Sequence, residues 1–152
     1  MRIFKTTCVS VILAALSITS AQAAAPSGRI VKLEAVANSK NMPMSSSGTM
    51  TRAMSGSAFA SFTINEKAST FCYRISAKGL KNFTEAHVQV TSTEKDVLIF
   101  NVKKINSTVT TCANQSNKLL RDLASHPSKY SLMIHTKAFP DGAVMGDLRF
   151  RK

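Results

Sequence analysis

Residues 130–150 have the sequence YSLMIHTKAFPDGAVMGDLRF, in which apolar and polar residues alternate on either side of a central break. Alternation with a period of two predicts β-strands, so we expect strands over 130–137 and 143–150. Between them, Pro140-Asp-Gly142 has the composition of a turn, because proline presets φ, aspartate bonds its own backbone and glycine tolerates left-handed conformations. The stretch therefore predicts an antiparallel hairpin whose turn lies at Pro140-Asp-Gly142.

Similar alternation predicts further strands, while residues 38–56 lack periodicity and resemble a long surface connection. One helix is predicted before Pro127, with Asn114 or Ser116 as its cap. Its apolar stripe consists of Leu119, Leu120 and Leu123. About seven strands and one short helix predict a mostly β fold, an antiparallel Greek-key-like sandwich or barrel. The further strands are expected over residues 29–37, 57–65, 70–78, 84–91 and 96–102.

Residues 1–23 have the pattern of a signal peptide: a short basic start, an apolar run over 9–18, and Ala21-Gln-Ala23 at the end. An uncleaved membrane anchor is the alternative, but the apolar run is too short to cross about 30 Å of hydrocarbon. We therefore expect export to the periplasm or the medium, with no transmembrane segment after cleavage. Residues 24–28 are then a flexible lead and 29–152 a single domain.

The formal net charge of +12 favours acidic partners, and Arg2 and Lys5 of the predicted signal account for two of these charges. An alternative is that the excess lysine only maintains solubility. Nucleic acid is not expected as a partner, because the chain has no tryptophan and no basic helix or aromatic strip for stacking. The expected partner is an unidentified protein or an acidic component of the cell envelope.

Signal cleavage would remove Cys8 and leave Cys72 and Cys112 as an even pair. In an oxidising compartment such a pair predicts a disulfide. Closing a loop of about 40 residues would stabilise the fold by about 4 kcal/mol in the chain-entropy model. A pair of metal-binding thiolates is the alternative, but it lacks the close spacing typical of cysteine metal sites.

Several segments together resemble the CHRD domain, the module named after chordin and also found in many exported bacterial proteins. The hairpin sequence over 130–148, with its HT, FPDG and GDL elements, carries most of the resemblance, which spans about residues 29–152. The weaker elements are GSAFA at 56–60, CYRISAKGL at 72–80, AHVQ at 86–89, LRDL at 120–123 and HP at 126–127. The resemblance implies an extracytoplasmic β-rich domain with no established reaction, and bacterial members often have a bridge where Cys72 and Cys112 stand.

The family commonly shows His-x-His where this chain has His87-Val-Gln89, so Gln89 removes one nitrogen ligand. The strand patterns place His87 and Gln89 on one face, and His135 and Asp147 on the polar side of the hairpin. Histidine and carboxylate suit zinc or copper, and His87 and His135 are the candidate metal ligands. The alternative is that these histidines, with His126, only hold local hydrogen bonds.

Four methionines occupy the aperiodic segment, and thioethers are soft ligands for Cu(I). The alternative is that they are incidental or fill gaps against the sheet as adaptable apolar side chains. The spacing of the methionines favours neither alternative. The four methionines are Met42, Met44, Met50 and Met54.

No segment has the turn of a nucleophile motif, and Asp122 with His126 at i, i+4 fits a charge pair near the end of a helix. We therefore expect no enzyme activity and no cofactor. The sequence favours an exported, non-catalytic binding or structural module at the cell envelope. A periplasmic copper- or zinc-handling protein with an incomplete histidine site is the alternative.

Overall fold

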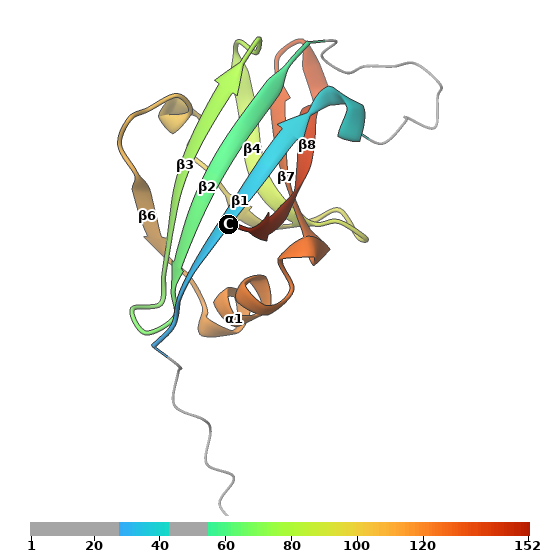
Figure 1. Cartoon of the computed structure of the whole chain (residues 1–152). Coiled ribbons are helices and arrows are strands. Elements are labelled where there is room, and N and C mark those ends of the chain that lie inside the picture. Colours follow the sequence, from blue (N-terminus) through green and yellow to red (C-terminus); the bar gives the residue numbers. More distant parts are fainter. Residues whose placement is uncertain (1–27, 43–54) are drawn as a thin grey trace, which may run out of the picture.

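The computed structural model describes residues 28–42 and 55–152, which form one curled, half-barrel sheet of eight antiparallel strands (Figure 1). The expected mostly β, antiparallel class is confirmed. The expected signal peptide, and its lead up to residue 27, lie outside the described residues. In chain order the strands are β1 (Ile30–Asn38), β2 (Ser57–Asn65), β3 (Thr70–Lys78), β4 (Phe83–Val90), β5 (Lys95–Ile99), β6 (Thr111–Asn114), β7 (Tyr130–Thr136) and β8 (Phe139–Phe150).

The sheet has the order β5-β4-β7-β8-β1-β2-β3-β6, so β5 and β6 form its two edges. Strands β1 to β3 alternate between buried and exposed positions, as their sequences predict. Their buried side chains, such as Leu33, Phe62 and Ile75, belong to the central apolar cluster. Phe100 packs against the rings of Phe62 and Tyr73 at centroid distances of 6.0 and 4.5 Å. Strands β2 and β3 therefore supply most of the aromatic side chains of the core.

Helix α1 (Asn117–Ser125) begins and ends where the sequence predicts, and it lies across one end of the curled sheet (Figure 1). Of the two predicted caps, Ser116 is the one used: its hydroxyl accepts a hydrogen bond from the Leu119 amide at 3.3 Å. Leu120 and Leu123 are fully buried. The helix closes the core at that end.

Three details of the predicted strands were wrong. Strand β6 was not predicted, because its residues are mostly exposed and do not alternate. It forms because Cys112 lies directly opposite Cys72 on β3 and the two are joined by a disulfide, as expected. The fifth strand ends at Ile99 rather than at residue 102, and a 3-10 helix, η2 (Val102–Lys104), follows.

The third error concerns the turn of the last hairpin. Thr136 pairs with Phe139, so the chain turns at Lys137-Ala138, and Pro140-Asp-Gly142 lies inside β8. There it supplies extra residues that shift the β7–β8 register between Ile134 and Thr136. Proline cannot donate to the ladder, and the φ of +123° at Gly142 suits glycine, so the turn-like composition forms a bulge instead.

The predicted surface connection after β1 begins with a 3-10 helix, η1 (Ser39–Asn41), which is capped by the side chain of Asn38. Met42 follows it and is buried rather than on the surface. A buried thioether can pack as an apolar side chain or serve as a soft ligand, so burial does not separate the two alternatives for Met42. Met44, Met50 and Met54 lie outside the described residues.

Candidate functional site

The two candidate histidines meet on one face of the β4–β7 pair. The register places Glu85 opposite His135 and His87 opposite Met133. Successive side chains of a strand point to opposite faces, so these four residues lie on the face that the core residues between them, such as Ala86 and Ile134, do not use. We call this side of the sheet the histidine face. His87 and His135, the two candidate ligands named from the sequence, therefore share this face of the sheet.

Glu85, His87 and His135 each offer a ligand atom, and these atoms all lie within 4.8 Å of one another. The two imidazole rings have a centroid separation of 5.0 Å. Two imidazole nitrogens and a carboxylate oxygen form a common ligand set for zinc and other transition metals. The three side chains are therefore close enough to share one ion after small adjustments of their rotamers.

His135 has a defined tautomer. Its Nδ1 lies 2.7 Å from the carbonyl oxygen of Pro140, and because a carbonyl only accepts, Nδ1 carries the proton and donates. The Nε2 atom then bears a lone pair. Within residues 28–42 and 55–152, this Nε2 is buried and has no hydrogen-bond partner. A backbone acceptor that fixes the tautomer in this way is the usual support of a metal-binding histidine.

His87 is 4% exposed, and both of its nitrogens face oxygen atoms. Nδ1 lies 3.2 Å from Glu85 Oε1, while Nε2 lies 3.0 Å from Gln89 Oε1 and 3.2 Å from Asp96 Oδ1. Whichever nitrogen binds an ion, an oxygen acceptor remains for the N–H on the other side of the ring. The carboxylates of Glu85 and Asp96 also make this position favourable for a cation, although the protein as a whole is basic.

Gln89 keeps a role in this arrangement even though it cannot supply a basic nitrogen. Its amide oxygen contacts the His87 ring, so it orients a candidate ligand. Asp147, which the sequence places on the same side as His135, pairs with Ser131 further along the hairpin and is exposed. It does not belong to the group of close ligand atoms found in the described residues.

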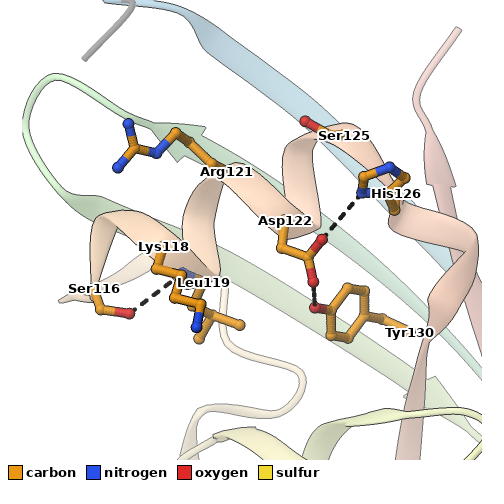
Figure 2. Close-up of a pocket in the computed structure, with 8 residues that line it drawn as sticks. All are labelled: Ser116, Lys118, Leu119, Arg121, Asp122, Ser125, His126 and Tyr130. Carbon is orange, nitrogen blue, oxygen red and sulfur yellow. Dashed lines mark hydrogen bonds and ion pairs between the residues drawn. The ribbon is translucent and has the colours of Figure 1, made fainter. Parts of the chain in front are cut away.

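His126 lies apart from this site, at the end of α1. Figure 2 shows Asp122 between His126 and Tyr130 in a surface pocket that is lined also by Lys118 and Arg121. Asp122 Oδ1 lies 3.0 Å from His126 Nδ1, as the i, i+4 spacing predicts, and its Oδ2 accepts a hydrogen bond from the Tyr130 hydroxyl.

The two partners of Asp122 change the acid–base behaviour of this pocket. The hydrogen bond from Tyr130, and then that from His126, lowers the pKa of Asp122 below 3.8. Burial, followed by the bond to Asp122, raises the pKa of Tyr130 to about 12. Asp122 therefore stays ionised and Tyr130 protonated at neutral pH. The group is a local structural contact between α1 and β7.

A model of the CHRD domain matches residues 33–148, which include every residue of the candidate metal site. The chain belongs to the CHRD domain family. No curated protein and no solved structure was matched in the same comparisons. None of the helices in the described residues is long and apolar enough to cross a membrane.

Two residues of this CHRD site were not predicted from the sequence. Glu85 supplies the carboxylate, and Asp96 reaches His87 from the edge strand β5. The spacing Glu85-x-His87 was a usable signal, because residues i and i+2 of a strand share a face. Asp96 had no comparable signal, since its approach depends on the β4–β5 register, which shifts between Val88 and Gln89.

Proposed function

We propose that this CHRD protein is an exported, non-catalytic binding module whose ligand is a transition-metal ion such as Zn(II) or Cu(II). The ion is held by Glu85, His87 and His135. The observation that carries this function is the buried Nε2 of His135, whose lone pair has no partner in the described part of the chain. A buried polar atom without a hydrogen bond is costly, and a metal ion would satisfy it.

Three features support a location outside the cytoplasm. Residues 1–23 have the composition of a signal peptide. Cys72 and Cys112 form a disulfide, which persists in oxidising compartments. CHRD domains are typically extracellular. Periplasm and medium both fit these features.

A binding role fits the surroundings of the site better than catalysis does. The partners of the two histidines are acceptor oxygens of Glu85, Gln89, Asp96 and Pro140, and none of them is a nucleophilic hydroxyl or thiol. Three protein ligands leave a fourth coordination position for water or for a competing ligand that takes over the released ion. Such a site suits a protein that takes up metal and releases it again.

Isothermal titration of metal-free protein with Zn(II) tests the proposal. We expect one ion per chain, with the affinity lowered about 100-fold in His87→Ala and in His135→Ala. His126→Ala is the matched control, because this histidine lies at the end of α1, and it should bind Zn(II) as the unaltered protein does. Absence of stoichiometric binding, or equal affinity in His135→Ala, would refute the proposed site.

A module that binds an acidic envelope component is the second candidate, favoured by the net charge of +12. It predicts co-sedimentation with vesicles that contain anionic lipid, with loss of binding as salt is raised, and none with neutral vesicles. Equal behaviour with both kinds of vesicle would remove this candidate. The two functions are separable, because His135→Ala should leave the sedimentation unchanged.

A further inference from the structure

Two methionines are buried away from the main core. Met42 and Met133 are 9% and 7% exposed, and apart from Pro127 every other buried apolar side chain of residues 28–42 and 55–152 belongs to the central apolar cluster. Met133 stands on the histidine face of β7, and Met42 follows η1, which packs against β8. The two thioethers therefore form a separate buried patch on the side of the sheet that carries the candidate metal ligands.

Gly142 brings these thioethers together. A Cβ atom built on Gly142 would lie 3.2 Å from the sulfur of Met42 and 3.2 Å from the sulfur of Met133. Both sulfurs thus lie beside the same point of the β8 bulge, in the space that a side chain at this position would occupy. The positive φ of Gly142 makes glycine the suitable residue there.

Met133 also lies beside the two histidines. Met133 is directly opposite His87 in the β4–β7 ladder and two residues from His135 on the same face of β7. Directly opposed residues have Cβ atoms about 5 Å apart. The bulge that contains Gly142 also contains Pro140, whose carbonyl fixes the tautomer of His135. One backbone irregularity therefore positions both the imidazole and the sulfur atoms.

We propose that Met133 and Met42 extend the site to a Cu(I) site of mixed imidazole and thioether ligands, a proposal that rests on the function proposed above. Thioethers are soft ligands that select Cu(I), whereas zinc gains little from them. His135 Nε2 and a nitrogen of His87 supply the imidazole ligands, and Met133 is the first thioether. Met42, which directly follows η1, is the second thioether ligand.

The competing explanation is that both methionines only fill a gap in the packing, which their flexible side chains do well. Leucine separates the two roles, because Met→Leu conserves volume and costs little stability while it removes the sulfur. Met145 provides a matched control. It lies opposite Met133 on β8, but the three atoms nearest to a Cβ at Gly142 all belong to Met42 and Met133.

The experiment is an oxygen-free titration of the protein with Cu(I) against the chelator bicinchoninate, with ascorbate as the copper reductant and a parallel Zn(II) titration. We expect the Met42→Leu/Met133→Leu double variant to lose about 100-fold in Cu(I) affinity while its Zn(II) affinity stays within about threefold. Met145→Leu should behave as the unaltered protein in both titrations. Thermal unfolding of each variant establishes that it is folded.

The outcomes distinguish this inference from the proposed function. Unchanged Cu(I) affinity in the double variant overturns the thioether assignment and leaves the zinc site standing. An equal loss in Met145→Leu also overturns it, because the effect would not depend on the sulfurs at Gly142. Zn(II) binding without Cu(I) binding by the unaltered protein overturns this inference alone. Binding of neither ion overturns both proposals.

Discussion

The sheet has two halves that differ in the regularity of their strand pairing. The regular half consists of β1, β2, β3 and β6, and the irregular half of β4, β5, β7 and β8. The β1–β2 and β2–β3 ladders pair residue for residue along their whole length, without a register shift. The β4–β5, β4–β7 and β7–β8 ladders each contain one. Regular pairing places every second side chain in the core, whereas a bulge redirects side chains and exposes backbone carbonyls to new partners. In the irregular half, the carbonyl of Pro140 becomes the partner of His135 in this way.

Polar burial follows the same division. Among the described residues, four buried polar side chains lie on β4 and β7, namely His87, Gln89, Ser131 and Thr136. His87, Gln89 and Ser131 have hydrogen-bond partners, whereas the Thr136 hydroxyl has none in the described residues, and an unpaired buried polar group lowers stability. The regular half carries the disulfide and three of the four clustered rings, those of Phe62, Phe71 and Tyr73, while Phe100 follows β5. The difference indicates that the regular half contributes more to stability, and it supports the proposal that the other half binds a ligand.

The largest expected effect is in the regular half. The Cys72→Ser/Cys112→Ser double variant should lower the free energy of unfolding by about 4 kcal/mol, because the bridge restricts the unfolded chain. Urea unfolding of the oxidised protein and the variant measures this change. The same variant should bind Zn(II) within about threefold of the unaltered affinity, since distant sites act independently. A large loss of Zn(II) affinity in a folded variant would contradict the separation of the two halves.

The next largest loss of stability is expected at the β8–β1 pair, where the two halves of the sheet join. A Cβ on Gly146 would lie 2.2 Å from the carbonyl oxygen of Val36, so Gly146→Ala must push two backbones apart. We expect a loss of about 3 kcal/mol in the free energy of unfolding. Gly28→Ala is the control, because its added methyl would make only ordinary contact with Lys67 and should change stability by about 0.5 kcal/mol or less. Equal stability of the two variants would rule out this close approach.

A smaller, pH-dependent effect is expected at the contact between α1 and β7. Tyr130→Phe should lower the free energy of unfolding by about 1 kcal/mol at pH 7, because it removes the hydrogen bond to ionised Asp122. The pKa of Asp122 is lowered in the folded state, so its contribution is present above pH 3.8 and is lost as the pH falls through the lowered value. Urea unfolding at pH 7 and at acid pH measures this loss.

For Tyr130, the free energy of unfolding is expected to fall at alkaline pH and not at acid pH. Its pKa is raised to about 12 in the folded protein, so the stability linked to it is present below pH 10 and is lost as the pH rises towards 12. Tyr73→Phe is the control, because the Tyr73 hydroxyl accepts from the Asn101 amide and has no carboxylate partner among the described contacts. The loss in the free energy of unfolding caused by Tyr73→Phe should not become smaller at acid pH. If both variants respond alike to pH, the Asp122 contact does not act as described.

Local sequence patterns predicted the regular half well. Alternation gave β1, β2 and β3 to within one residue, because each of these strands buries one face and exposes the other. It failed for β6, which is an exposed edge strand bridged through Cys112. The Pro140-Asp-Gly142 segment was misplaced as the turn, since a bulge and a turn require the same backbone freedom.

The site was predictable only in part. His87 and His135 stood out as histidines on strands, but their proximity to Glu85 depends on the β4–β7 register. No local pattern encodes a register that is shifted by a bulge. The approach of Met42 to Met133 likewise depends on the contact of η1 with β8 and on the missing side chain at Gly142. These relations are set by tertiary pairing and not by the periodicity of one segment.

In the proposed function, the irregular half holds a metal ion through His87 and His135. Nitrogen-15 NMR spectra of the histidine rings, recorded as Zn(II) is added, test this binding because each ring nitrogen is observed separately. We predict that the His135 Nε2 resonance and one nitrogen of His87 shift with saturation at one equivalent, while the His126 resonances stay in place. Unchanged His87 and His135 resonances, or an equal shift of His126, would contradict it.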